Sequence, residues 1–179
     1  MQFAFENLPI RKIHGGEIRK GKRKEARPIA TKRAMHLTLR SSRAKGRFSL
    51  HTKKKEIHAI LAHFAAAFQV RLYSESNNGN HLHLIVQARS RGGFKRFLMA
   101  ISGRIAQLMT RATKGRPLAG RFWDYVPFTR IVEWGKDFVT TWRYVRMNQL
   151  EAAGIIPYQP RNEPFLRRSR GISGKGRDV

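Results

Sequence analysis

The segment from Tyr73 to Val86 constrains the fold of this chain more than any other part of the sequence. It contains the dipeptide Asn78-Gly79, and the residues that follow alternate between polar and apolar. Asn-Gly is typical of a two-residue β-hairpin turn of type I′, because both central residues of that turn adopt a positive φ. The sequence therefore predicts two antiparallel strands, over 70–75 and 81–87, joined by a tight turn.

Two histidines, His81 and His83, follow this turn directly. Successive side chains of a β-strand point to opposite faces, so one face carries Leu82, Leu84 and Val86 and the other carries both imidazoles. Two imidazoles held side by side on a rigid strand can bind one divalent cation or polarise one phosphate group. We therefore take this pair as the starting point for a functional site.

Further strands and helices are indicated on both sides of the hairpin. Polar and apolar residues alternate over 35–40, which predicts a first strand. The segment 122–132 looks extended, although Pro127 favours an edge strand or a bulge there. Apolar residues recur at spacings of three and four in three segments, which predicts helices over 51–68, 94–113 and 137–153. Gly154 is an expected C-terminal signal for the last of these helices.

The order of these elements is strand, helix, strand, strand, helix, strand, helix. The first six match the split β-α-β arrangement of a ferredoxin-like fold. We therefore expect an α+β domain in which two helices cover one face of an antiparallel sheet. His81 and His83 then lie on the other face, and the third helix has only that open face or a partner molecule left to cover.

The charge of the chain limits the partners that it can have. It contains 37 Lys and Arg against 11 Asp and Glu, a formal net charge of +26. Residues 11–33 hold ten basic and two acidic residues, residues 161–179 hold six and two, and residues 34–160 hold 21 and six. Such an excess indicates a polyanionic partner, most commonly nucleic acid, and a ribosomal type of protein would fit it equally well.

This distribution predicts three regions: a basic, disordered or loosely docked arm over 1–33, a folded domain over 34–158 and a basic tail over 159–179. The chain has no cysteine, which excludes disulfides, a catalytic thiol and thiolate metal sites. No stretch is apolar and long enough for a membrane span, and the first residues do not match a signal peptide. We therefore expect a soluble cytoplasmic protein.

The predicted third helix carries polar side chains along one stripe. They lie three, four or seven residues from Tyr144 and are Thr140, Thr141, Asn148 and Glu151. If this stripe covers the open face of the sheet, a phenol and a carboxamide approach the two imidazoles. A tyrosine hydroxyl, with a pKa of about 10, is a weak nucleophile until its target is polarised. A magnesium or manganese ion held by two imidazoles and an oxygen ligand would polarise a phosphodiester as a Lewis acid.

Each of these features has a plainer explanation when it is taken alone. A His-x-His pair on a strand is more often a coincidence or a zinc site, Tyr144 can be a core or interface aromatic, and Asn148 can be an exposed helix residue. His58 and His63, in a mostly apolar helical segment, are expected to be packed or surface groups rather than ligands. His14, His36 and His51 lack partners in the sequence and are given no functional role. The joint occurrence of the pair, a downstream Tyr-x-x-x-Asn and a strongly basic domain favours catalysis.

The sequence resembles the single-tyrosine transposases of the His-hydrophobe-His (HUH) endonuclease class, and most of all the REP-associated tyrosine transposases of bacteria. The resemblance covers about residues 34–158. The matching stretches are Met35-His-Leu-Thr-Leu-Arg40, Asn80-His-Leu-His-Leu-Ile-Val86, Gly120-Arg-Phe-Trp123 and Tyr144-Val-Arg-Met-Asn-Gln-Leu-Glu-Ala-Ala-Gly154. The last stretch is similar to the family's Tyr-Ile-x-x-Asn-Pro-x-x-Ala-Gly pattern, with Gln149 in place of the usual proline.

The resemblance implies an enzyme that nicks single-stranded DNA beside a hairpin, forms a 5′-phosphotyrosine and leaves a free 3′-hydroxyl. Tyr144 would be the nucleophile, and His81 and His83 would bind Mg or Mn. The missing proline leaves open whether Asn148 or Gln149 supplies the third metal contact, although the i,i+4 spacing from Tyr144 favours Asn148. Such an enzyme is expected in the bacterial cytoplasm, at the nucleoid.

Two groups of residues are candidates for DNA contact. After the predicted second helix, aromatic rings that can stack on bases are interleaved with basic groups: Arg121, Phe122, Trp123, Tyr125 and Arg130. Phe122 and Trp123 can equally fill the core. In the arm, the side chains expected to contact phosphates are Arg19, Lys20, Lys22, Arg23 and Lys24.

Two other functions compete with a transposase. A replication initiator or relaxase of the HUH class would share the chemistry and differ in its preferred DNA. A non-catalytic nucleic-acid-binding protein derived from such an enzyme would not bring His81, His83 and Tyr144 together. Both a monomer and a homodimer are compatible with the sequence, as is action of Tyr144 within its own chain or across a dimer.

Overall fold

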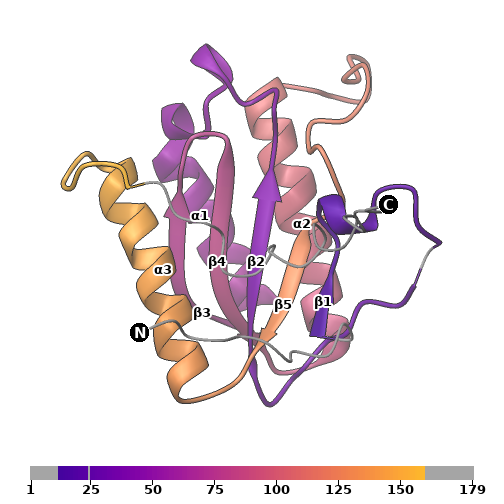
Figure 1. Ribbon diagram of the computed structural model, residues 1–179. Coiled ribbons are helices and arrows are strands. Elements are labelled where there is room, and N and C mark those ends of the chain that lie inside the picture. Colours follow the sequence, from indigo (N-terminus) through magenta and orange to yellow (C-terminus); the bar gives the residue numbers. More distant parts are fainter. Residues whose placement is uncertain (1–11, 24, 160–179) are drawn as a thin grey trace, which may run out of the picture.

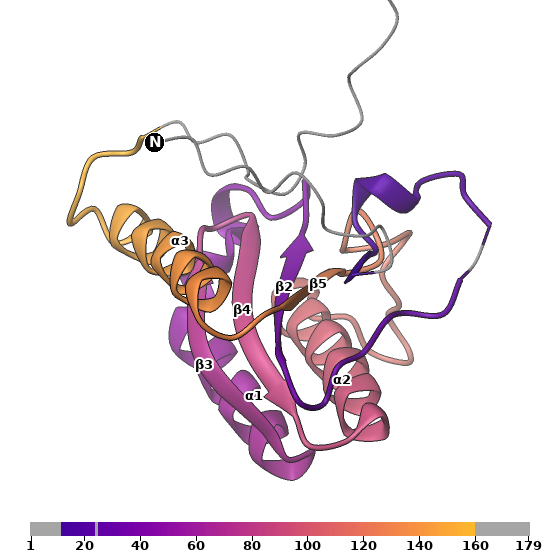
Figure 2. The ribbon, with the colours of Figure 1, turned by 60° about the horizontal axis from the view of Figure 1, so that its bottom comes forward.

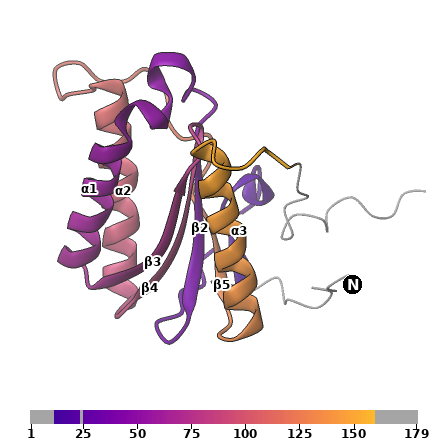
Figure 3. The same ribbon diagram turned by 90° about the vertical axis from the view of Figure 1, so that its left-hand side faces the viewer.

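The computed structural model describes residues 12–23 and 25–159, which form an α+β fold in three layers (Figure 1). In chain order, its strands and α-helices are β1 (Ile13–His14), β2 (Ala34–Arg40), α1 (Lys54–Ala67), β3 (Val70–Asn77), β4 (His81–Ala88), α2 (Arg91–Thr110), β5 (Phe128–Val132) and α3 (Lys136–Ala152). Figure 3 shows α1 and α2 on one face of the sheet and α3 on the other. The predicted fold class is confirmed.

The sheet has the strand order β1-β5-β2-β4-β3, and every neighbouring pair is antiparallel. The four strands from β2 to β5 have the arrangement expected of a ferredoxin-like fold, with the first and third of them in the centre. The register pairs Leu37 with Leu84 and Leu39 with Leu82. The apolar positions of β2 and β4 therefore share one face, which packs against α1 and α2.

The main hydrophobic core fills the space between that face and the two helices. Its buried side chains include Leu37, Leu39, Leu82, Leu84, Ile57, Leu61, Phe94, Phe97 and Ile101. The helical members recur at spacings of three and four, because those positions share one side of a helix. Each such side chain contributes about 1.5–3 kcal/mol through its removal from water.

A second, smaller apolar cluster lies on the opposite face, beneath α3. Its buried members are Ala34, Ile85, Val132 and Val145, and the rings of Tyr73, Phe138 and Tyr144 pack against them. Figure 2 shows that α3 lies over the side of the sheet formed by β3 and β4. The third helix therefore covers the open face of the sheet, which was one of the two predicted positions; the other was a partner molecule.

The hairpin turn differs from the predicted type. The backbone N–H of Asn78 donates to the carbonyl of His81, so the two central residues are Gly79 and Asn80. In this turn only Gly79 has a positive φ, of 82°, which is the pattern of a type II′ turn. The predicted type I′ turn is wrong because the strand register places Gly79 and Asn80 at the centre of the turn, one position after the Asn78-Gly79 pair on which the prediction rested.

The basic segment before β2 is docked more closely than predicted. Ile13 and His14 form β1 and pair with β5, and Arg27 donates from Nη1 to the Pro127 carbonyl and the Thr129 hydroxyl. At these residues the chain is not disordered or loosely docked, as predicted for 1–33, because Ile13 and His14 pair with β5 and the Gly16 N–H donates to the Val126 carbonyl. Residues 1–11, 24 and 160–179, which include most of the predicted tail, lie outside the described residues.

The last strand is shorter than the extended segment predicted over 122–132. β5 begins at Phe128, immediately after Pro127, because proline has no N–H to donate to a ladder. The residues from 122 to 127 form bends and loop, and Phe122 is buried in the main core. No helix among the described residues is both long and apolar enough to cross a membrane.

We predict that Gly79→Ala lowers the free energy of unfolding by about 1–3 kcal/mol. The reason is twofold: φ is positive at this position, and a Cβ would lie 2.8 Å from Cδ2 of His51. Gly103→Ala is the matched control, since Gly103 is helical and a Cβ there meets nothing within 4 Å. That change should stabilise the protein by up to about 1 kcal/mol. Urea unfolding checks both variants, and equal stability of Gly79→Ala and wild type would contradict the turn geometry.

Candidate active site

His81 and His83 lie at the start of β4, on the face of the sheet that carries α3. In the register with β2, Arg40 lies opposite His81 and Thr38 lies opposite His83. The centroids of the two imidazole rings are 4.7 Å apart, with the ring planes at 86°. His83 is buried, whereas His81 is half-buried. The predicted shared face of the pair is therefore realised, with its inner member closed off from water.

Both imidazoles are neutral at pH 7 because they are removed from water. Burial, with a smaller effect of Arg40, lowers the pKa of His81 to about 4. Burial, followed by the neighbouring His36 and His81, lowers the pKa of His83 well below its usual value. A neutral imidazole keeps a nitrogen lone pair, which is the form that binds metal ions or accepts a proton.

The hydrogen-bond partners of the pair occupy one nitrogen of each ring. His81 Nδ1 lies 2.6 Å from Oδ1 of Asn80. His83 Nδ1 lies 3.1 Å from Oγ1 of Thr38. His83 Nε2 is buried and has no hydrogen-bond partner among the described residues. A buried nitrogen left in this state calls for an explanation, and a bound ligand is one.

His36 on β2 belongs to the same cluster, although no partner was expected for it. Its Nε2 lies 3.2 Å from Nδ1 of His83, and the two rings are stacked with centroids 5.3 Å apart. The expectation that His36 lacks a partner is therefore wrong. Alternation along 35–40 already placed His36 and Thr38 on one face, but their position beside His83 follows only from the pairing of β2 with β4.

Tyr144 projects from α3 toward these histidines. Its ring meets that of His83 edge to face, at 5.4 Å between centroids and 80° between planes. It meets His36 in the same way, at 6.1 Å and 81°. The structure therefore brings together a tyrosine and two histidines from α3, β4 and β2, which are far apart in the sequence.

Asn148 and Gln149 lie on different sides of α3. Asn148 is buried; its Nδ2 donates to the Tyr144 carbonyl at 2.8 Å, and its Oδ1 accepts from Nδ2 of Asn78 in the hairpin turn at 3.3 Å. The Gln149 side chain instead accepts from Nη1 of Arg146 in an exposed contact. Of the two candidates for an oxygen ligand, Asn148 is the one that faces the hairpin with the histidine pair.

The donor set at this point consists of imidazoles and amides, without a carboxylate. Among the described residues, no group of three or more His, Cys, Asp and Glu side chains is arranged to hold a metal ion. One observation is compatible with a bound divalent cation: Nε2 of His83 is buried and has no hydrogen-bond partner in the described part of the protein. The residues that would hold it are His83 and His81, with the amide oxygen of Asn148 as the third donor.

Arg130, predicted as a DNA contact, does not lie on the surface in this fold. Its side chain is fully buried, and Nη1 donates to both carboxylate oxygens of Asp137 at 3.0 and 2.9 Å. Nη2 donates to the hydroxyl of Thr141. Because Arg130 is on β5 and its partners are on the first two turns of α3, the pair fastens the tyrosine-bearing helix to the sheet.

The other candidates for DNA contact divide between core and surface. Phe122 is buried in the core, the alternative that the sequence left open, and Trp123 is half-buried with Nε1 donating to the Ser102 carbonyl. Tyr125 is half-buried, and the exposed basic candidates are Arg121, Lys20, Lys22 and Arg23. Lys24 and the side chain of Arg19 lie outside the described part of the chain.

We predict that Asp137→Asn lowers the free energy of unfolding by about 3–5 kcal/mol, because it leaves the buried Arg130 guanidinium without its counter-charge. Urea unfolding measures this loss. Glu56→Gln is the control, since Glu56 pairs with Lys53 on the exposed surface of the domain, where an ion pair contributes little. If Asp137→Asn is as stable as Glu56→Gln, the buried pair does not fasten α3.

No protein-family model matches the chain, and no curated protein gives a significant match. Among solved structures, a REP-associated tyrosine transposase bound to a REP hairpin matches with a TM-score of 0.54 and 13% sequence identity, over 72% of this chain and 73% of that protein. A candidate transposase from Deinococcus radiodurans R1 matches with a TM-score of 0.42 and 18% identity, over 71% of this chain and 98% of that protein. The chain thus has the fold of a REP-associated tyrosine transposase, as the sequence resemblance implied.

Proposed function

We propose that the protein is an HUH-type nuclease and strand transferase that nicks single-stranded DNA beside a hairpin and links itself to the cut strand through Tyr144. The observation that carries this proposal is the edge-to-face contact between the rings of Tyr144 and His83, 5.4 Å apart between centroids. A phenol beside two neutral imidazoles is the constellation that covalent attack on a phosphodiester needs.

The reaction follows from the groups present. The oxygen of Tyr144 attacks the phosphorus, a new O–P bond forms, and the bond from phosphorus to the 3′-oxygen breaks. The phenol proton leaves to water, and the departing 3′-oxygen takes up a proton to become a 3′-hydroxyl. The 5′-phosphotyrosine that results is still a phosphodiester, so the same strand can be rejoined. A bound Mg or Mn ion would supply Lewis-acid stabilisation of the phosphate charge.

The histidine pair and Asn148 support a metal-binding role within this proposal. His81 and His83 are neutral, and Nε2 of His83 is buried without a hydrogen-bond partner in the described part of the protein. Asn148 lies one helical turn after Tyr144 and is tied to the hairpin through Asn78. These residues would hold the cation next to the nucleophile.

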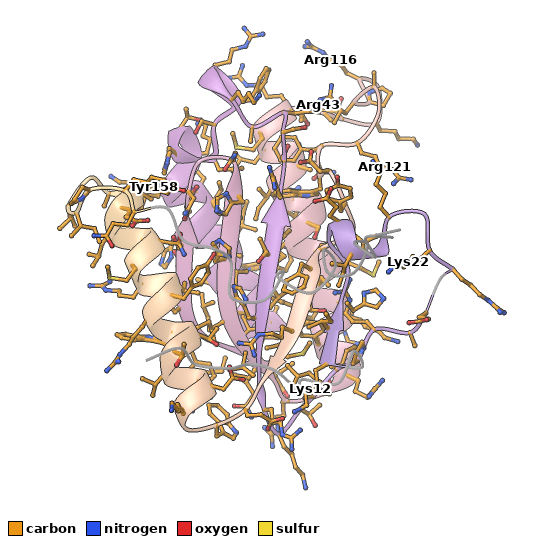
Figure 4. All side chains as sticks on the ribbon, in the orientation of Figure 1. Lys12, Lys22, Arg43, Arg116, Arg121 and Tyr158 are labelled. Atoms are coloured by element: carbon orange, nitrogen blue, oxygen red, sulfur yellow. The ribbon has the colours of Figure 1, made fainter. Side chains whose placement is uncertain are left out.

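A basic surface at one end of the molecule supports a DNA partner. β2 ends at Arg40, opposite His81, and the loop that follows packs on the loop after α2 through hydrogen bonds from Arg43 to the carbonyls of Ala119 and Arg121. Figure 4 shows Arg43, Arg116 and Arg121 projecting at this end. Exposed cations beside the histidine pair would attract a phosphate backbone and steer it to the site.

The relative of similar fold adds support for the kind of DNA. That REP-associated tyrosine transposase was solved bound to a REP hairpin, so the shared fold is compatible with a hairpin beside the cleavage site. A non-catalytic binder is less well supported, because the Tyr144 ring contacts His83, which itself lies beside His81. A replication initiator or relaxase would use the same chemistry and would be distinguished by its preferred DNA.

The direct test is Tyr144→Phe, which removes one oxygen and leaves the ring packed against His83. We expect DNA binding to persist while nicking falls by at least about a hundredfold. The assay is denaturing electrophoresis after incubation with end-labelled hairpin DNA and Mn²⁺. Tyr125→Phe is the matched control, because it removes the same oxygen from a half-buried tyrosine outside the cluster.

Normal nicking by Tyr144→Phe together with loss of nicking in Tyr125→Phe would contradict the assignment of the nucleophile. Normal nicking by both variants would contradict tyrosine chemistry altogether.

A further inference from the structure

A buried histidine on β2 remains without a role in the reaction proposed above. His36 is 1% exposed, and its Nε2 lies 3.2 Å from Nδ1 of His83. The Thr38 hydroxyl lies 3.1 Å from the same nitrogen. Two side chains of the neighbouring strand therefore converge on one nitrogen of His83 and leave the other, Nε2, without a partner in the described fold.

This arrangement limits which nitrogen of His83 can carry the proton when the ring binds a cation. A neutral imidazole has one N–H and one lone pair. With the proton on Nε2, a buried N–H would face no acceptor and would lose its hydrogen bond to water without compensation. With the proton on Nδ1, the N–H donates to His36 Nε2 or Thr38 Oγ1, both within hydrogen-bond distance. The reverse arrangement, in which His36 Nε2 donates to His83 Nδ1, also makes this hydrogen bond, but it puts the His83 proton on Nε2. Only the Nδ1–H form leaves a lone pair on Nε2, so it is the form that can bind a cation there.

His81 reaches the same form through a different partner. Its Nδ1 lies 2.6 Å from Oδ1 of Asn80, an amide oxygen that accepts a proton but cannot donate one. Both rings of the pair therefore direct an Nε2 lone pair away from their Nδ1 partners. Metal-binding histidines commonly have such a partner on the nitrogen that does not bind the metal.

We propose that His36 is a positioning residue, which accepts the Nδ1 proton of His83 and so presents the Nε2 lone pair of His83 to a divalent cation. The cation-binding step rests on the proposed function. The protonation of His83 does not, because it is a property of the protein without any metal.

The experiment has one readout for each step. In the first, long-range ¹H–¹⁵N spectra of the imidazoles are recorded at pH 7 in the presence of a chelator. They report which nitrogen of His83 is protonated. The signals of His83 are identified by their loss in His83→Gln. In the second, electron paramagnetic resonance titration measures Mn²⁺ affinity. Two variants are compared: His36→Leu removes the acceptor, whereas His36→Gln can place an amide oxygen near the position of Nε2. Urea unfolding confirms that both variants fold.

In wild type, we expect His83 to be protonated on Nδ1. In His36→Leu, we expect a mixture of both forms and a loss of Mn²⁺ affinity of about ten- to a hundredfold, with most of the affinity restored in His36→Gln. A wild-type His83 protonated on Nε2 would overturn the proposal, and so would an unchanged spectrum in His36→Leu.

The two proposals fail separately. If His83 is protonated on Nδ1 in a manner that depends on His36 but no Mn²⁺ binds to wild type, the positioning by His36 stands and the metal-dependent nuclease fails. If Mn²⁺ binds equally to wild type and both variants, the nuclease proposal stands and His36 has no positioning role.

Discussion

The buried ion pair between Arg130 on β5 and Asp137 on α3 determines where the third helix lies. A guanidinium that is fully buried must be paired, since an isolated charge in the interior costs several kcal/mol. Here both carboxylate oxygens and the Thr141 hydroxyl serve it, all from the start of α3. Because the helix is rigid, fixing its first two turns also fixes the direction of Tyr144. The ion pair two turns away thus helps to hold that ring against His83, together with the apolar cluster beneath α3.

The two faces of the sheet serve different purposes. The face under α1 and α2 carries the main hydrophobic core and supplies most of the hydrophobic stabilisation. The face under α3 combines a small apolar cluster with a layer of buried polar groups: His36, His83, Arg130, Thr141 and Asn148. Such a layer is stable only when its polar groups form hydrogen bonds with one another. This requirement makes the layer rigid and also sensitive to substitution. Within this layer, Nε2 of His83 is buried without a hydrogen-bond partner in the described fold, and a bound ligand is one explanation for that.

The sequence predicted the features that depend on local periodicity. The three helices, the hairpin and the shared face of His81 and His83 follow from spacings of two, three and four. Features that depend on a distant partner were missed or misread. His36 acquires its role only when β2 pairs with β4, and Arg130 was expected at the surface because nothing in the sequence links it to Asp137. The short strand β1 was hidden in a basic segment whose composition suggests disorder. The turn type depended on the register of β3 and β4, which the sequence did not reveal.

The convergence of Tyr144 with the histidine pair can be tested by locating the covalent bond itself. The protein is incubated with hairpin DNA and Mn²⁺, digested with nuclease and trypsin, and its peptides are analysed by mass spectrometry. Arg143 and Arg146 flank the nucleophile, so trypsin releases it within the tripeptide Tyr144-Val145-Arg146. A nucleotide phosphate attached to that tripeptide is the expected result. Attachment to the peptide from Phe122 to Arg130, which contains Tyr125, or recovery of nicked DNA without any modified peptide, would contradict it.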